Sequence, residues 1–304
     1  MDALIDVLNL HVQADLAGPM LWVSLVFIGL GVGVLTGLFG VGGGFLAVPA
    51  MNILLGIPYE IAIGSSLNFI VGTSIAGLGK HIRAKHVEGK TVFVLAIGSM
   101  VGAVLGDMLQ DVMIVHLARG DEVTFDNIMT GLFIVLLLLT AWVVFAGPKE
   151  HHTGLSPMQR LGVGPRVDLP GAGLLGVSLP GMILTGLGVG VVTGIFGIGG
   201  GVLFVPILLL LVGLSAHQAV GTSLGVVLLA SIAGTIKKGY AGKVSLSVAM
   251  ALLLGSAIGV QLGAWLCVKL HANKLRRAFA GIVLISAMLM AASLAKDLIT
   301  QSSP

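Results

Sequence analysis

The sequence predicts an all-α polytopic membrane protein with about eight transmembrane helices arranged in two homologous halves. The chain has 304 residues, 56% of them hydrophobic and only 10% charged, whereas soluble domains carry about 25% charged residues. Charged side chains are absent from long stretches, the longest being the 68 residues of 169–236. A helix needs about 20 apolar residues to cross the hydrocarbon core, so these stretches predict membrane spans.

The uncharged stretches divide the chain into four parts. An amphipathic helix lying at the membrane interface is expected over 1–17. A first four-span repeat follows over 18–146, a linker over 147–177, and a second four-span repeat over 178–304. Because the linker is rich in proline and glycine, it is expected to be irregular and partly flexible. The predicted spans are at about 20–39, 61–79, 91–109 and 127–146, and in the second repeat at about 179–196, 217–236, 244–268 and 275–295.

A glycine-rich element occurs twice. Residues 29–49 and 186–206 are identical at 16 of 21 positions, at an offset of 157 residues. The similarity continues without a gap to Gly106 and Gly263. Each copy is an apolar helix that runs into a glycine cluster and then into a short apolar segment. In membrane transporters, helices broken in this way form the substrate site.

The short segments 45–57 and 201–213 leave the topology open. Each is either a re-entrant half-helix or one half of a broken span. We favour re-entrant segments, which place the N-terminus and the basic loops 80–90, 147–177 and 237–243 in the cytoplasm by the positive-inside rule. The acidic loop 110–126 is then outside, and so is one basic loop, 269–277. If the short segments do cross, the two halves are inverted relative to each other.

The clustered glycines predict an anion-binding site. Glycine lets the backbone approach a ligand closely, and the start of the following helix presents free N–H groups to an anion. Hydroxyl and amide side chains in the next span of each half are candidates to join this site. Helix packing is the alternative role for all of these residues. The candidate substrate-binding residues are Gly40, Gly42, Gly43, Gly44, Ser65, Ser66, Asn68, Gly197, Gly199, Gly200, Gly201, Thr222 and Ser223.

Several function classes lack their motifs. The glycine clusters are not followed by the G-K-[ST] of a P-loop and have no dinucleotide-binding context. The single Cys267 excludes a disulfide framework and a cysteine-based metal site. We therefore expect no cofactor, no metal, no catalytic residue and no nucleic-acid partner, and we predict that the protein is not an enzyme.

The repeated G-x-F-G-[VI]-G-G-G-x-L-x-V-P motif, with G-[ST]-S-L and S-x-A-G after it, resembles the sulfite exporter TauE/SafE family of bacterial and archaeal permeases. The resemblance covers about 29–106 and 186–263. It implies a multi-pass inner-membrane transporter of small anions such as sulfite or organosulfonates. The expected partners are this anion, the lipid bilayer and a further copy of the chain in a homo-oligomer. An anion channel with the same glycine-lined site is the alternative function.

Overall fold

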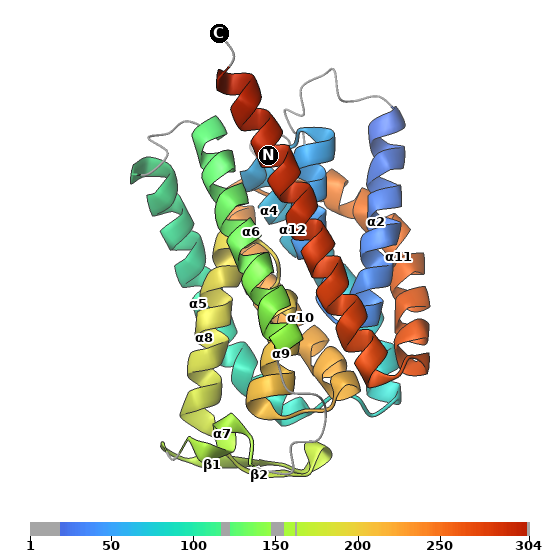
Figure 1. The fold of residues 1–304 in the computed structure, drawn as a ribbon, viewed down its shortest axis with the longest axis vertical. Helices are drawn as coiled ribbons and strands as arrows, with labels where there is room; N and C mark the ends of the chain where they lie inside the picture. Colours follow the sequence, from blue (N-terminus) through green and yellow to red (C-terminus); the bar gives the residue numbers. More distant parts are fainter. Residues whose placement is uncertain (1–18, 117–121, 147–154, 162, 303–304) are drawn as a thin grey trace.

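The computed structural model describes residues 19–116, 122–161 apart from 147–154, and 163–302. The expected N-terminal interfacial helix lies outside these residues. Figure 1 shows a bundle of long helices with a small two-stranded sheet at its lower edge. The elements are α2 (Pro19–Phe39), α3 (Gly44–Pro49), η2 (Ala50–Leu54), α4 (Tyr59–Arg83), α5 (Gly89–His116), α6 (Glu122–Ala146), α7 (Pro157–Arg160), β1 (Arg166–Leu169), η3 (Pro170–Ala172), β2 (Leu174–Ser178), α8 (Leu179–Phe196), α9 (Gly201–Ile207), η4 (Leu208–Val212), α10 (Ala216–Tyr240), α11 (Leu246–Lys269) and α12 (Ala272–Ser302).

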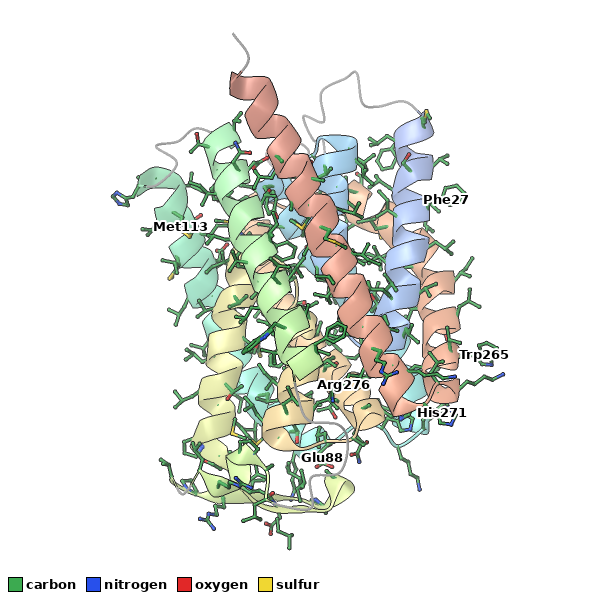
Figure 2. All side chains as sticks on the ribbon, viewed as in Figure 1. Phe27, Glu88, Met113, Trp265, His271 and Arg276 are labelled. Carbon is green, nitrogen blue, oxygen red and sulfur yellow. The ribbon has the colours of Figure 1, made fainter. Side chains whose placement is uncertain are left out.

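Eight of the described helices are long and apolar enough to cross a membrane, which confirms the predicted all-α polytopic fold. Apolar side chains cover the outside of the bundle as well as its core. Phe27 and Trp265 point away from the helices in Figure 2, and they are 67% and 54% exposed. Because lipid tails are apolar, such side chains are stable on the outer surface of a membrane protein.

Helices at equivalent positions of the two repeats exchange partners. Helix α2 packs along α11, and α8, its counterpart in the second repeat, packs along α5, the counterpart of α11. Helix α4 packs on its own counterpart α10, and α6 packs on its counterpart α12. Most of the helix packing therefore joins one repeat to the other, so the two repeats form a single interlocked body.

The regularly spaced glycines make this close packing possible. In α2, a Cβ atom built on Gly33 would lie 2.7 Å from the Cα atom of Ser256 in α11. On α8, a Cβ atom built on Gly190 would lie 2.7 Å from the Cα atom of Ser99 in α5. The helix backbones approach so closely that no side chain fits between them, as in other small-residue helix interfaces of membranes.

Contacts between distant segments define two ends of the bundle. At one end, which we call the acidic end, Asn52 bonds Asp126 at 3.0 Å, and Lys243 pairs with Glu60 at 3.2 Å and with Asp111 at 3.0 Å. At the other, which we call the basic end, Lys90 bonds the carbonyl oxygen of Asp168, Gln218 bonds that of Gly171, and Arg276 bonds that of Val144. The basic end is the lower end in Figure 1, beside β1 and β2.

The two repeats run in opposite directions through the bundle. Helix α4 begins at the acidic end with Glu60, whereas α10 begins at the basic end with Gln218. Helix α2 and the segment α3–η2 form a hairpin that returns to the acidic end, where Asn52 lies. The corresponding hairpin of α8 and α9–η4 returns to the basic end, where η4 packs on α7 of the linker.

This arrangement corrects the favoured topology. The loop that holds Lys243 lies at the end opposite the loop that holds Lys90, so these two basic loops do not share one side of the membrane. The basic segment 269–277, expected on the outside, lies instead with 80–90. The reason is that each short segment returns through the bundle, which is the inverted alternative.

The linker is also more regular than expected. Its described part forms a short helix, α7, capped by Ser156, and an antiparallel pair of strands in which Arg166 lies opposite Ser178 and Val167 opposite Val177. The side chain of Ser178 then caps α8 by accepting a hydrogen bond from the N–H of Gly181. The polar cap fixes the point at which the chain enters the second repeat.

Candidate functional site

The two glycine clusters adopt the backbone conformations that favour glycine. The φ angles of Gly40, Gly42 and Gly43 are +70°, +74° and +91°. In the second repeat, the corresponding angles of Gly197, Gly199 and Gly200 are +64°, +67° and +75°. Residues with a Cβ atom are strained at such angles. The remaining glycines, Gly44 and Gly201, are the first residues of α3 and α9.

The clusters lie against each other in the interior, and we call residues 40–44 and 197–201 together the glycine junction. All ten residues are buried. A Cβ atom built on Gly44 would lie 2.7 Å from the Cα atom of Ile198, and one built on Gly201 would collide with Val41. The two broken helices therefore meet at one place, as the duplicated motif predicts for a shared site.

Two serines join the repeats across this junction. The Ser66 hydroxyl of α4 donates to the carbonyl oxygen of Gly197 at 2.6 Å, and the Ser223 hydroxyl of α10 donates to that of Gly40 at 2.7 Å. Both side chains are fully buried. Each repeat thus holds the glycine cluster of the other.

The other predicted polar residues lie elsewhere. Ser65 accepts a hydrogen bond from the N–H of Ser245 at 2.9 Å, and Thr222 accepts one from the N–H of Glu88 at 3.0 Å. Both therefore anchor loops at the ends of the bundle in this structure. Asn68 is partly exposed, and no side-chain hydrogen bond of it occurs among the described residues.

The backbone of the junction offers hydrogen-bond donors. In the described part of the chain, no hydrogen bond is made by the N–H groups of 42–44 or of 199–201, whereas Gly40 and Gly197 bond the preceding turns. Buried N–H groups without acceptors are rare in proteins. Successive N–H groups in turns of this kind form concave anion-binding sites. The junction can therefore bind an anion without a charged side chain.

A proline lies late in each short helix. Pro49 and Pro206 are the sixth residues of α3 and α9, not in the first turn, where a missing N–H matters least. A π-helix follows in both repeats, η2 and η4. Proline removes one donor of the helical ladder, and the chain passes into a wider helix just after it.

Ile70 closes the junction, a role that no sequence signal distinguishes from ordinary core packing. Its side chain would lie 2.9 Å from a Cβ atom on Gly42, 2.7 Å from one on Gly44 and 3.1 Å from one on Gly199. It is fully buried in α4. Ile70 thus fills the space beside three glycines of the junction.

Two further serines near the junction were not predicted as site residues. Ser74 and Ser231, which are equivalent in the two repeats, are fully buried, and their hydroxyls have no hydrogen-bond partner. The Ser231 hydroxyl would lie 3.1 Å from a Cβ atom on Gly199. An unpaired buried hydroxyl calls for an explanation such as a ligand or a water. The repeat of S-x-A-G in the sequence was the available signal.

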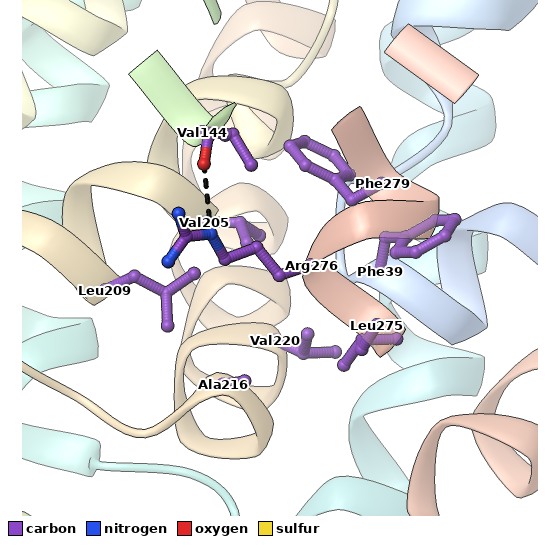
Figure 3. Close-up of a pocket in the computed structure, with 9 residues that line it drawn as sticks. All are labelled: Phe39, Val144, Val205, Leu209, Ala216, Val220, Leu275, Arg276 and Phe279. Atoms are coloured by element: carbon purple, nitrogen blue, oxygen red, sulfur yellow. Dashed lines mark hydrogen bonds between the residues drawn. The ribbon is translucent and has the colours of Figure 1, made fainter. Parts of the chain in front are cut away.

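A pocket approaches the junction from the basic end. Phe39 and Val220, which line it, flank Gly40: Phe39 precedes it in the chain, and the Val220 carbonyl lies against it. Figure 3 shows Arg276 reaching into this otherwise apolar pocket, where its Nε bonds the Val144 carbonyl at 3.0 Å. The guanidinium thus places a positive charge in the pocket that Phe39 and Val220 also line. In the sequence this arginine is predicted only as part of a basic loop.

Comparison with known proteins gives a consistent result. The protein-family model described as "Sulfite exporter TauE/SafE" matches residues 25–290. The chain is 31% identical over 268 residues to "Probable membrane transporter protein YjnA" of Bacillus subtilis, covering 88% of this chain and 98% of that protein. It is 29% identical to "Probable membrane transporter protein MJ0441" of Methanocaldococcus jannaschii, covering 88% and 94%. No solved structure matches the chain.

Proposed function

The chain belongs to the sulfite exporter TauE/SafE family of membrane transporters, and from this premise we propose that it is a secondary transporter of small sulfur-containing anions. The substrates are sulfite or organosulfonates, which cross the inner membrane of a bacterial or archaeal cell by alternating access. Relatives occur in both a bacterium and an archaeon.

The observation that supports this proposal is the glycine junction. Six N–H groups of buried residues make no hydrogen bond in the described structure, and they belong to the two clusters that pack against each other. Oxyanions and sulfonates carry several acceptor oxygens and a negative charge, so they match a site made of backbone donors. The unpaired Ser231 hydroxyl beside Gly199 is a further donor. Substrate-binding residues in this proposal are the clustered glycines with Ser66, Ser223 and Ser231.

The opposite direction of the two repeats supports alternating access. Transporters built from inverted repeats bind their substrate at the interface of the repeats and expose it alternately to each side. Ile70 packs against three glycines of the junction, and in this proposal its side chain closes the path between the two sides of the membrane, as a carrier requires. Carrier transport is therefore the favoured mechanism over an anion channel.

The distribution of charge orients the protein. The described basic side chains at the basic end are Lys80, Arg83, Lys85, Lys90, Arg160, Arg166, Lys269, Lys274, Arg276 and Arg277. Those described at the acidic end are Lys237, Lys238 and Lys243. By the positive-inside rule the basic end faces the cytoplasm. The Arg276 pocket then opens toward the cytoplasmic side.

Flux measurements in proteoliposomes test the proposal. We expect saturable uptake of labelled sulfite and accelerated exchange when unlabelled sulfite is present inside, which a channel does not show. Gly199→Ala places a methyl group against Ile70 and Ser231, so we expect anion binding to weaken by about 1.4 kcal/mol or more. This loss corresponds to an uptake reduced about tenfold. Gly31→Ala is the matched control, since nothing lies within 4 Å of a Cβ atom there.

The outcomes separate the candidates. Equal uptake by the two glycine variants would remove the junction from the transport path. Uptake that neither saturates nor exchanges would favour the channel. If sulfite is not transported, the same assay with methanesulfonate and taurine decides whether sulfonates are the substrates, and failure of all three would refute the proposed substrate class.

A further inference from the structure

Three histidines gather at the basic end, close to the glycine junction. His81 ends α4, His86 lies in the loop after it, and His217 is in the first turn of α10. The ring centroids of His81 and His86 are 5.9 Å apart, and those of His86 and His217 are 5.2 Å apart. His81 is 1% exposed. We call these three residues the histidine cluster.

Three of the six ring nitrogens of the cluster have no hydrogen-bond partner among the described residues. His217 Nε2 lies 3.1 Å from the Cys267 carbonyl oxygen and 3.2 Å from that of Leu270, so this nitrogen is the donor. In the described structure, both ring nitrogens of His81 and the Nδ1 atom of His86 lack a hydrogen bond. The carbonyl oxygen of Gly37 faces His81. Buried imidazole nitrogens without partners are open to bind a proton.

The equivalent positions at the acidic end carry fixed charges. At the offset of 157 residues, His81 corresponds to Lys238, His86 to Lys243 and His217 to Glu60. There Lys243 pairs with Glu60, and Lys238 pairs with Asp107 at 2.5 Å. Of the two ends, the cytoplasmic one therefore holds imidazoles where the other holds lysines and a glutamate.

The cluster touches the elements that hold the junction. A Cβ atom built on Gly221 would lie 3.1 Å from the Cβ atom of His81 and against the backbone of His86. Two residues further along α10, Ser223 bonds the carbonyl oxygen of Gly40. The carbonyl oxygen of Gly37 in α2 faces His81, and Gly37 lies one turn before residues 40–44. The histidine cluster thus contacts α10 and α2, the two helices that lead to Gly40.

Other charged or titratable side chains surround the cluster. The Lys80 Nζ atom bonds the Gln261 carbonyl at 2.7 Å, and the Glu88 carboxylate lies against Gly171 of the linker. Burial and the neighbouring His217 hold the pKa of His86 below its ordinary value. In the segments next to the histidines, the groups are Lys80 and Arg83 on α4, Lys85 and Glu88 in the loop, Cys267 and Lys269 on α11, and His271 after it.

We propose that the histidine cluster is a proton-binding site that couples anion transport to the proton, with one proton bound for each anion that enters the glycine junction. This proposal rests on the proposed function. A proton on the cluster attracts the anion, and by linkage the bound anion raises the proton affinity of the cluster to the same degree. Imidazole nitrogens bind a proton, whereas alkali cations such as Na⁺ take oxygen ligands, so the proton is the cation that fits this cluster.

Proton uptake upon substrate binding tests this directly. Methanesulfonate is the probe, because its charge does not change near neutral pH. When it is added to purified protein in weakly buffered detergent solution near pH 7, a pH indicator should report about one proton taken up per anion bound. His86→Gln combined with His217→Gln should abolish this uptake. His116→Gln, at an exposed position on α5, is the control.

Transport supplies the second measurement. A proton gradient should drive sulfonate accumulation in proteoliposomes of the wild type. The double variant should accumulate about tenfold less sulfonate, while it still exchanges sulfonate across the membrane. Anion flux without proton uptake by the wild type would overturn the coupling alone. Proton uptake that persists in the double variant would show that the proton binds outside the histidine cluster. Absence of any anion binding or flux would overturn the proposed function as well.

Discussion

The hydroxyl of Ser223 donates a hydrogen bond to the carbonyl oxygen of Gly40, 2.7 Å away, although 183 residues separate them in the chain. In the equivalent bond, Ser66 of the first repeat donates to the carbonyl oxygen of Gly197 in the second repeat. Each repeat therefore fixes the broken helix of its partner. A change in one glycine cluster must be accompanied by a change in the other, as alternating access between two inverted repeats requires.

The first prediction concerns these crossing bonds. Ser223→Ala removes the buried hydroxyl that donates to the carbonyl oxygen of Gly40. Because this oxygen then loses its hydrogen bond, the free energy of unfolding should fall by about 1–3 kcal/mol. We expect a lower unfolding temperature in detergent and a comparable effect for Ser66→Ala. Thr36→Ala is the control, because the Thr36 hydroxyl bonds only within its own helix, to Val32. Equal stability of all three variants would show that the crossing bonds are unimportant.

The sequence predicts the fold class and the location of the junction, because apolar runs and clustered glycines are local signals. It does not predict which serines bond the glycines, because Ser65 and Ser66 are adjacent in the sequence and differ only in the helices that α4 packs against. The sequence also did not predict the direction of the second repeat. Lys237 and Lys243 suggested a cytoplasmic loop, but both are paired with acidic residues that lie far away in sequence.

The second prediction concerns the barrier over the glycines. Ile70→Ala should increase sulfite flux or lower its saturation constant, because it removes the side chain that covers Gly42, Gly44 and Gly199. Ile70→Trp should abolish flux while the protein still folds with a modest loss of stability. The same changes at Ile75, which is 59% exposed on the same helix, should have little effect. Unchanged flux in both Ile70 variants would place the transport path elsewhere.

The third prediction tests the inverted arrangement. Cys267 is the single, buried cysteine, so Cys267→Ser gives a cysteine-free background. In this background Lys85→Cys should react with a membrane-impermeant thiol reagent from the cytoplasmic side, and Ala241→Cys from the other side, since both positions are exposed. The parallel arrangement predicts that positions 85 and 241 react from the same side. Labelling of intact cells and of inverted vesicles distinguishes the two results.

The fourth prediction concerns helix packing. Gly33→Leu should prevent the close approach of α2 to α11, because even a Cβ atom at this position would lie 2.7 Å from the Cα atom of Ser256. We expect loss of more than 3 kcal/mol by overpacking and little folded protein after purification. Gly31→Leu, on the exposed face of the same helix, should be tolerated. Size-exclusion chromatography of the two variants gives the comparison, and aggregation of both would mean that this part of α2 tolerates no leucine.

The fifth prediction concerns the buried ion pair at the acidic end. Lys238 is 1% exposed, and it lies 2.5 Å from Asp107, which also pairs with Lys237 at 2.8 Å. Asp107→Asn leaves a buried cation without its counter-charge and should destabilise the protein by about 3–5 kcal/mol. Combining Asp107→Asn with Lys238→Met should restore most of this loss, because the uncompensated charge is then gone. Thermal unfolding of the single and double variants in detergent measures the effect. A double variant as unstable as Asp107→Asn would instead mean that the carboxylate stabilises this end through Lys237.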